Sequence, residues 1–440
     1  MEREARAATR RVDTSASDRA DISEVEYRQV RLERVVLVGL RTTQSEEEAE
    51  NSLRELAALA ETAGSRVMDG VIQRRSLPDP ATYLGSGKAK ELADIVRAHE
   101  ADTVIVDEEL APSQRRGLED VVDAKVVDRT ALILDIFAQH AKSREGKAQV
   151  ELAQLEYLLP RLRGWGESMS RQAGGRVAGG AGIGSRGPGE TKIELDRRRI
   201  RARMAKLKAE IARMEPARRT QRGARRRGGV PSVAIAGYTN AGKSTLLNCL
   251  TDAGVLVEDA LFATLDPTVR RARTADGREY TLTDTVGFVR NLPTQLVEAF
   301  RSTLEEVGAA DVLLHVVDAA HPDPVSQVEA VRSVLSGIEG TDRIPELIAL
   351  NKADLATPEQ LAVLRTAFPE SVALSAKTGY GVGTLRAALE DLLPRPSVLI
   401  DVVIPYSAGS LVHRVHEEGE VEREEYAAEG TRLVDAGNFL

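Results

Sequence analysis

The chain has very little cysteine and few aromatic residues. Its 440 residues include one Cys, Cys249, and one Trp, Trp165, and only 3 % are Phe, Trp or Tyr. A single Cys excludes an intrachain disulfide and a zinc site built from Cys ligands. Cys249 is therefore expected to be a small packed residue. The hydrophobic fraction of 42 % is still sufficient for packed cores, and the length predicts several domains.

Long apolar runs are also missing. No stretch approaches the length of about 18 apolar residues that a transmembrane helix requires. The N-terminal stretch Met1–Arg6 is largely charged, so it lacks the apolar centre of a signal peptide. These features predict a cytoplasmic protein without a membrane span.

The charges are unevenly distributed. The formal net charge is −8, yet residues 142–230 contain 23 Lys and Arg against 9 Asp and Glu. A basic middle inside an acidic protein favours a polyanionic partner for that middle. Solvated basic helices are common too, so charge alone leaves both interpretations open.

The N-terminal part shows two kinds of pattern. Residues 1–25 have no hydrophobic period, which predicts a disordered extension. Residues 26–141 alternate between strand and helix patterns, which predicts a small α/β domain with a mostly parallel sheet. The expected strands are 35–38, 65–72, 103–106 and 125–128, and the expected helices are 45–63, 88–99, one from Pro112 and 130–140.

Gly85-Ser-Gly-Lys88 within this domain looks like a fragment of a phosphate-binding loop. It lacks the full spacing and a buried strand directly before it. A turn at the start of a helix is the favoured interpretation, and a second nucleotide site is the alternative.

Residues 142–228 predict an antiparallel helical hairpin. Apolar residues recur at helical spacing over 148–159 and again over 193–214, and such narrow stripes suit helices packed on each other. The joining stretch Gly174–Gly189 has eight Gly in sixteen residues. It is either a flexible linker or a tip that orders against nucleic acid. Arg218–Arg227 is expected to be a basic hinge into the next domain.

Residues 229–396 predict a nucleotide-binding domain of the P-loop class. The apolar strand 231–236 leads into Gly-x4-Gly-Lys-Ser, and a helix pattern follows. Glycines let consecutive backbone N–H groups wrap a β-phosphate. Lys243 is expected to bridge the β- and γ-phosphates, and Ser244 to bind Mg²⁺. The predicted loop consists of Gly237, Tyr238, Thr239, Asn240, Ala241, Gly242, Lys243, Ser244 and Thr245.

Further motifs, each placed after a predicted strand, favour guanine over adenine. A buried Asp354 is expected to accept hydrogen bonds from guanine N1–H and the 2-amino group, which adenine lacks. The 375–377 segment is expected to offer a backbone N–H to guanine O6. The predicted base-binding residues are Asn351, Lys352, Ala353, Asp354, Ser375, Ala376 and Lys377.

Two segments between these motifs are expected to contact the γ-phosphate and its metal ion. Asp284 should hold Mg²⁺ through water, and the Gly287 N–H should meet the γ-phosphate. Thr264 is the predicted second protein ligand of Mg²⁺, with Thr268 as the alternative. Lys243 and Gly287 are the predicted catalytic groups. The two segments contain Phe262, Ala263, Thr264, Leu265 and Asp266, and Asp284, Thr285, Val286 and Gly287.

A small α+β module is predicted for residues 397–440. Its expected elements are a strand over 398–404, a helix over 407–416 and a strand on each side of Gly430. The run of Glu residues between 417 and 425 is expected to be a solvated face.

These motifs together resemble the HflX family of translation-factor-class GTPases. The resemblance rests on 237–244, 262–266, 284–288, 351–354 and 375–377, and outside that domain on 83–88 and 187–191. It implies a cytoplasmic GTPase that associates with the large (50S) ribosomal subunit and splits or rescues stalled ribosomes. It also implies that the N-terminal domain and the hairpin contact ribosomal RNA.

Phe288 stands where many GTPases have the Gln that orients the attacking water. Phe can neither donate nor accept a hydrogen bond, so slow intrinsic hydrolysis and activation by the ribosome are expected. A monomer is expected off the ribosome. Two alternatives remain open: a GTP-dependent signalling switch with a protein partner, and an RNA-remodelling ATPase that uses Gly85–Lys88.

Overall fold

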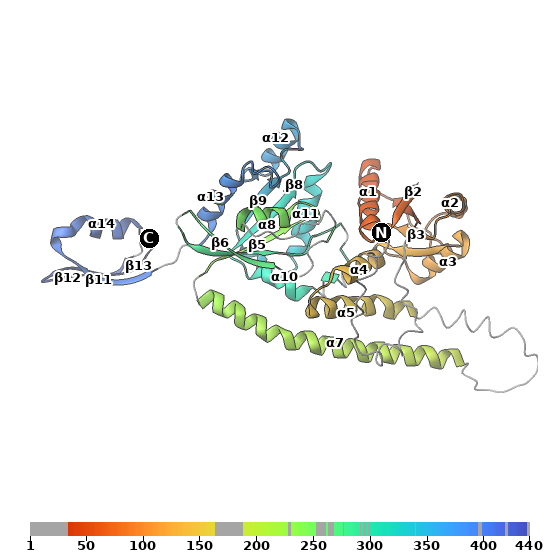
Figure 1. Ribbon diagram of the computed structural model, residues 1–440, viewed down its shortest axis with the longest axis horizontal. Coiled ribbons are helices and arrows are strands. Elements are labelled where there is room, and N and C mark those ends of the chain that lie inside the picture. Colours follow the sequence, from red (N-terminus) through yellow and green to blue (C-terminus); the bar gives the residue numbers. More distant parts are fainter. Residues whose placement is uncertain are drawn as a thin grey trace, which may run out of the picture.

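The protein consists of an N-terminal domain, a helical hairpin, a central domain and a small C-terminal module (Figure 1). The computed structural model describes residues 34–162, 188–227, 230–251, 261–262, 268–275, 277–290, 292–293, 296–297, 300–338, 340–394, 398–418 and 421–437. Residues 1–25 and most of the Gly-rich stretch, for which the sequence made predictions, fall outside these ranges. Among the described residues, no helix is long and apolar enough to cross a membrane.

The N-terminal domain is built on a four-stranded parallel sheet in the order β2-β1-β3-β4. Its central strands are apolar and fully buried, as expected for a sheet covered on both faces. The prediction of a small parallel α/β domain is confirmed. The strands are β1 (Arg34–Arg41), β2 (Arg66–Arg74), β3 (Thr103–Val106) and β4 (Lys125–Asp128).

Four helices complete this domain, and their ends follow local capping chemistry. Ser45 accepts from the Glu48 N–H while Glu48 bonds back to the Ser45 N–H, which forms a capping box at the start of α1. The α1 residues Leu56 and Leu59 are fully buried. The helices are α1 (Glu46–Thr62), α2 (Ser86–Ala98), α3 (Pro112–Val122) and α4 (Arg129–His140).

The hairpin pairs α5 (Arg144–Arg161) with the 40-residue α7 (Pro188–Arg227). Ala148, Leu152 and Leu207 form its apolar seam, and Arg203 binds Glu151 through two hydrogen bonds of 2.6 and 2.7 Å. The expected hinge at Arg218–Arg227 is wrong, because α7 continues through this stretch. Its Arg and Ala residues are good helix formers, and they outweigh the breaking effect of Pro216 and Gly223.

The central domain carries a six-stranded sheet in the order β10-β9-β8-β5-β7-β6. Five strands are parallel, and only the edge strand β6 (Thr268–Arg273) runs antiparallel to its neighbour. Strand β6 was not predicted, since its Arg-rich sequence is unlike a buried strand. The other elements are β5 (Ser232–Gly237), α8 (Lys243–Thr251), β7 (Glu279–Asp284), α10 (Arg301–Gly308), β8 (Val312–Asp318), α11 (Pro324–Leu335), β9 (Glu346–Asn351), α12 (Pro358–Ala367), β10 (Val372–Ala373) and α13 (Val382–Leu392).

One hydrophobic cluster continues from the N-terminal domain into the central domain. The ring of Phe137 on α4 lies 4.6 Å from that of Phe262 and 5.2 Å from that of Phe300, measured between centroids. Aromatic pairs at this spacing add to the free energy of area burial. The two domains therefore share a packed interface beside the segment that follows α8.

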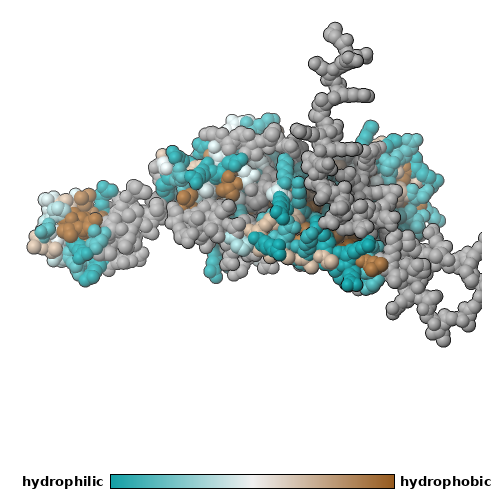
Figure 2. All heavy atoms as spheres, turned by 60° about the horizontal axis from the view of Figure 1, so that its bottom comes forward, coloured by the Kyte–Doolittle hydropathy of each residue, from teal (hydrophilic) through white to brown (hydrophobic). Residues whose placement is uncertain are grey.

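The C-terminal module is a three-stranded antiparallel sheet covered by one helix, α14 (Gly409–Glu418). Its small core is Ile404, Val415 and Leu433, and Figure 2 shows hydrophobic residues gathered on its surface. The predicted α+β module is confirmed, and of the Glu run expected to be a solvated face, Glu424 and Glu425 are exposed on β12. The strands are β11 (Val398–Ile404), β12 (Val421–Ala427) and β13 (Gly430–Gly437).

Candidate nucleotide-binding site

The Gly-rich loop 237–242 connects β5 to α8 at the carboxyl edge of the central sheet. Gly237 has φ +153°, and a Cβ there would lie 2.2 Å from the Val316 carbonyl oxygen. Gly242 has φ +92°, and its Cβ would lie 2.3 Å from Asn351 Nδ2. Only Gly fits these two positions, so the loop keeps the tight course that a phosphate-binding wrap requires.

Lys243 begins α8 and folds back over this loop. Its Nζ donates to the carbonyl oxygens of Gly237 (3.1 Å) and Tyr238 (2.8 Å), and the residue is only 7 % exposed. Burial lowers the pKa of Lys243 to about 8, although the carboxylate of Asp284 raises it in part. A buried ammonium held by neutral carbonyls is stabilised by an anionic ligand.

Ser244 and Asp284 meet beside Lys243. The Ser244 hydroxyl donates to Asp284 Oδ2 at 2.8 Å, and Asp284 is 1 % exposed at the end of β7. The next residue, Thr285, bonds the Ile235 carbonyl at 2.7 Å and so fastens this segment to β5. A buried carboxylate beside a hydroxyl is an oxygen donor set of the type that Mg²⁺ prefers.

The segment that was expected to supply a second metal ligand is only partly described. Phe262 is buried in the interface with the N-terminal domain. Thr268 begins β6 opposite Asp284 in the strand register. The remaining predicted residues Ala263, Thr264, Leu265 and Asp266 lie outside the described ranges.

Residues 286–290, here called the switch segment, lie against the phosphate-binding loop. The Phe288 N–H donates to the Gly237 carbonyl (3.1 Å), and the Thr239 N–H donates to the Phe288 carbonyl (2.7 Å). A Cβ on Gly287 would lie 2.7 Å from Thr239 Cγ2 and 3.1 Å from Lys243 Nζ. The Phe288 side chain is 2 % exposed, so it packs in the core and faces no water at the loop.

Asn351 joins the loop to the predicted base-binding segments. Its Nδ2 donates to the Ala241 carbonyl at 2.7 Å, and its Oδ1 accepts the Ala376 N–H at 2.9 Å. Lys352, with φ +61°, forms an ion pair with Asp318 at 2.8 Å, and the Ala353 N–H donates to the Leu374 carbonyl. The structure therefore brings the 241, 351 and 376 positions together as one unit.

Asp354 was expected to be buried, and that expectation is wrong. It lies exposed in the turn after β9, because the chain leaves the sheet at this point. Ser375 is buried and its hydroxyl accepts the Thr378 N–H at 3.2 Å, whereas Lys377 is exposed. Asp354 and Lys377 thus remain open to solvent on either side of the Asn351 bridge.

The Gly85–Lys88 stretch has a different structure. Gly85 is the N-cap of α2, and its N–H donates to Gln73 Oε1 at 2.9 Å. Lys88 is already helical and pairs with Glu91 at 2.7 Å. The favoured prediction of a helix-entry turn is confirmed, because Gly85 and Lys88 belong to the start of α2.

Glu55 was not singled out from the sequence, yet it touches the loop from the N-terminal domain. It accepts a 2.7 Å hydrogen bond from the Tyr238 hydroxyl across 183 residues of sequence. Glu55 is one of six Glu in α1, so no local pattern distinguishes it. Only the packing of two domains brings it to the site.

The strand–loop–helix wrap, the paired Ser244 and Asp284, and the Asn351 bridge define a P-loop GTPase. Three family models match: the GTP-binding GTPase N-terminal region at residues 50–138, the GTP-binding GTPase middle region at 140–225, and the 50S ribosome-binding GTPase at 232–352. The chain belongs to the HflX family of GTPases.

Two curated relatives illustrate the extent of the similarity. GTPase HflX of Lacrimispora saccharolytica is 46 % identical over 90 % of this chain and 92 % of its own length. GTPase HflX of Escherichia coli is 42 % identical over 91 % of this chain and 92 % of its own length. A GTP-binding protein from Sulfolobus solfataricus, crystallised with GDP, is 26 % identical over 82 % of this chain and 98 % of its own, with a TM-score of 0.42.

Proposed function

We propose that this protein binds GTP at the carboxyl edge of the central sheet, hydrolyses it to GDP and phosphate, and associates with the large (50S) ribosomal subunit. The observation that carries the nucleotide assignment is the convergence of Lys243, Asp284 and Asn351, each at the end of a buried strand or at the loop that follows one. Family membership supports the same assignment.

In this proposal the phosphates bind to the backbone N–H groups of the 239–245 stretch and to Lys243. The two carbonyl bonds of Lys243 Nζ position its charge above the loop. The Gly287 N–H meets the γ-phosphate. The exposed carboxylate of Asp354 accepts from guanine N1–H and the 2-amino group, and the base covers it on binding.

Ser244 and Thr264 are the proposed protein ligands of Mg²⁺, with Asp284 acting through water. The 2.8 Å contact between Ser244 and Asp284 places two hard oxygen donors together, which fits this ion. When bound, Mg²⁺ neutralises the charge that develops on the β- and γ-phosphates. Lys243 and Gly287 contribute donors to the same oxygens.

Hydrolysis by the isolated protein should be slow. The Phe288 side chain is buried against the N-terminal domain, so no hydrogen-bonding side chain at this position orients the attacking water. In our proposal the ribosome supplies the missing contact, and GTPase activity is therefore ribosome-stimulated.

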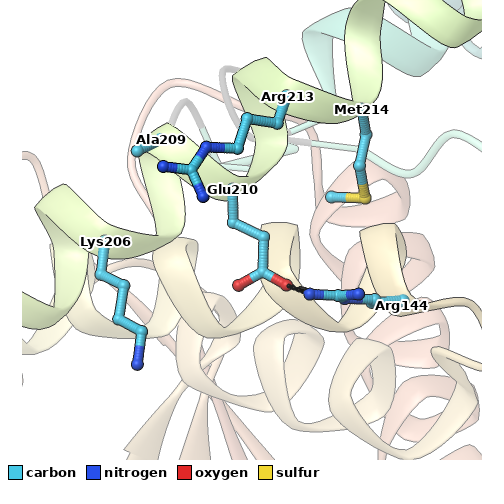
Figure 3. Close-up of a pocket in the computed structure, with 6 residues that line it drawn as sticks. All are labelled: Arg144, Lys206, Ala209, Glu210, Arg213 and Met214. Carbon is cyan, nitrogen blue, oxygen red and sulfur yellow. Dashed lines mark hydrogen bonds and ion pairs between the residues drawn. The ribbon is translucent and has the colours of Figure 1, made fainter.

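The helical hairpin is the proposed contact with ribosomal RNA. A cleft of about 580 Å³ lies between the start of α5 and α7, and Figure 3 shows its lining side chains. Glu210 is paired with Arg144 at 2.6 Å, so Lys206 and Arg213 leave this surface positively charged. Basic side chains at this density bind phosphate backbones in a salt-dependent way. The lining residues are Arg144, Lys206, Ala209, Glu210, Arg213 and Met214.

We further propose that GTP-dependent binding of this hairpin splits or rescues stalled ribosomes, in the cytoplasm and as a monomer off the ribosome. GTP would order the switch segment through its γ-phosphate, and hydrolysis would release it. The RNA-remodelling alternative is not favoured, because the Gly85–Lys88 stretch is an ordinary helix start.

The test is GTP hydrolysis with and without purified 50S subunits, together with co-sedimentation over a range of salt concentrations. The variant Lys206→Glu/Arg213→Glu should bind 50S more weakly and show a shallower salt slope. The matched control Arg343→Glu/Arg365→Glu changes the net charge equally on an exposed part of the central domain and should bind normally. Absence of stimulation and of co-sedimentation in the unmodified protein would refute the ribosomal assignment.

A further inference from the structure

A polar contact connects the N-terminal domain to the phosphate-binding loop. The hydroxyl of Tyr238, the second residue of that loop, donates to Glu55 Oε2 on α1 at 2.7 Å. Tyr238 is 6 % exposed. Burial raises the pKa of this hydroxyl and the Glu55 carboxylate raises it further, so Tyr238 remains a neutral donor.

The same pair of side chains also holds the end of the switch segment. The Arg290 N–H donates to Glu55 Oε1 at 3.2 Å and to the Tyr238 hydroxyl oxygen. Two residues earlier, Phe288 is bonded to Gly237 and Thr239 through its backbone. The segment is thus fastened to the loop at one end and to Glu55 at the other.

Glu55 is itself held in place from the N-terminal domain. Arg129 bonds Glu55 through one guanidinium nitrogen and Asp107 Oδ1 through another, at 2.7 Å for the latter. Burial alone would lower the pKa of Arg129, but the two carboxylates outweigh it and raise the pKa. The Arg129 side chain is 3 % exposed and that of Glu55 17 %, so this largely buried ion pair restricts the orientation of the Glu55 carboxylate.

Apolar contacts flank this polar connection. Phe137 packs on Phe262 and Phe300, and the Leu261 N–H reaches the Thr62 hydroxyl at 3.4 Å. The N-terminal domain therefore contacts the chain both before the 263–267 stretch and after Gly287. These are the two segments that a bound γ-phosphate repositions in P-loop GTPases.

We propose that Glu55 is a positioning residue that couples the docking of the N-terminal domain to the placement of the switch segment. Movement of residues 286–290 toward a γ-phosphate breaks the bonds of Arg290 and Tyr238 to Glu55. The interface then differs between the GTP and GDP forms. By linkage, the factor by which GTP in place of GDP weakens this interface equals the factor by which the interface lowers the preference for GTP over GDP. A substitution that removes the Glu55 contact should therefore shift the ratio of the two nucleotide affinities. This inference rests on the proposed GTP binding.

The experiment compares the full chain bound to GDP with the full chain bound to guanylyl imidodiphosphate, a GTP analogue that resists hydrolysis. Hydrogen–deuterium exchange of the α1 and α4 amides should differ about fivefold or more between the two forms, in the range of ordinary allosteric coupling. Tyr238→Phe and Glu55→Ala should each reduce this difference below about twofold. The double variant should add nothing, because both changes remove the same contact.

Tyr157→Phe is the matched control. Tyr157 has the same exposure of 6 % and donates a hydroxyl bond of 2.8 Å to Asp128, within the N-terminal domain and α5. This variant should keep the full difference. The proposal is overturned if the unmodified protein exchanges alike in both forms, if Tyr238→Phe keeps the difference, or if Tyr157→Phe loses it equally.

Nucleotide affinities and 50S co-sedimentation, measured on the same samples, separate two kinds of failure. If the protein bound neither nucleotide, the proposed function itself would fail. If it bound both and co-sedimented with 50S but showed no nucleotide-dependent exchange, only the role of Glu55 would be lost. A shifted ratio of GTP to GDP affinity in Glu55→Ala, restored by Glu55→Gln, supports positioning over general loosening.

Discussion

The two parallel sheets of this molecule use their carboxyl edges differently. In open α/β sheets this edge is where ligands bind. In the N-terminal domain the edge residues satisfy one another: Asp107 pairs with Arg129, and Asp128 accepts from the Leu110 N–H, from Tyr157 and from Arg161. In the central domain the edge carries a Gly-rich loop and a lysine whose ammonium donates to two carbonyl groups of that loop.

The difference shows how one sheet architecture can serve either as a structural support or as a ligand-binding site. Where carboxylates and guanidinium groups neutralise each other, the edge joins helices and gains rigidity. Where a buried ammonium lies over a Gly-rich loop, the carboxylate of Asp284 offsets only part of the effect of burial, and an anionic ligand stabilises the ammonium further. The N-terminal sheet thus serves as a support, and the central sheet as the nucleotide site.

The largest expected effect distinguishes the two lysines that follow Gly-rich stretches. Lys243→Ala should lower GTP hydrolysis by about 10³-fold, the upper range for removing one preorganised donor at a developing charge. Lys88→Ala should change the rate less than about twofold, because Lys88 lies within α2 and pairs with Glu91 on the same helix. Single-turnover hydrolysis measures both. Equal losses would place a second nucleotide site in the N-terminal domain.

Asp354→Asn should come next in size. The amide replaces the carboxylate that we propose accepts two guanine hydrogen bonds, and it presents a donor to one of them. Since bonds to a charged group are the stronger kind, GTP affinity should fall about 10²-fold or more. Equilibrium titration with a fluorescent guanine nucleotide gives the value. An unchanged affinity would contradict the assignment of guanine recognition to Asp354.

Two glycine substitutions compare the same two Gly-rich stretches, with a smaller expected change in nucleotide affinity. Gly242→Ala introduces a Cβ 2.3 Å from the pinned side chain of Asn351 at φ +92°, so GDP affinity should fall about tenfold. Gly85→Ala has an ordinary φ of −63°, and its Cβ meets only the ends of Arg75 and Gln73. It should leave affinity within about twofold. Calorimetric titration of both variants decides whether the two Gly-rich stretches differ as described.

The smallest expected effect is a loss of stability of the central sheet at low pH. Burial tends to raise the pKa of Glu346, but hydrogen bonds from His315 and Arg332 outweigh it and lower the pKa from 4.5 to about 2. Glu346 therefore stabilises the fold above pH 4.5, and this contribution is lost as pH falls toward 2.

Between pH 6 and pH 3.5 the loss should reach about 1 kcal/mol. Exchange protection of the β8 and β9 amides measures it, and Glu346→Gln should lack this part of the acid dependence. A variant with the same acid dependence as the unmodified protein would show that the His315–Glu346–Arg332 contacts contribute no measurable stability.

Much of the fold was predictable because local patterns and final structure agree. The strand at 125–128, the helix start at Pro112 and the loop before Lys243 all carry short-range signals: apolar runs, a Pro suited to a first turn, and Gly at fixed spacing. The same signals located the candidate site residues. Their mutual placement follows from parallel strands that end at one edge.

The rest could not be predicted from local patterns. The edge strand β6 is held by backbone pairing with β7, so its Arg residues point to solvent and leave no apolar period. Asp354 was expected to be buried, yet nothing in the sequence of residues 351–354 indicates whether other parts of the protein cover this turn. The contact between Glu55 and Tyr238 depends on domain packing across 183 residues, to which no sequence window is sensitive.

Helix α7 gives the hairpin a mechanical property. Its 40 residues extend about 60 Å at 1.5 Å per residue, and its last residue, Arg227, lies five positions before β5 begins at Ser232. A rotation of about 5° at the end near the central domain would displace the opposite end by about 5 Å, comparable to one helical turn. The length of the helix thus gives it the geometry of a lever arm: any rotation at the central domain would be enlarged at its far end.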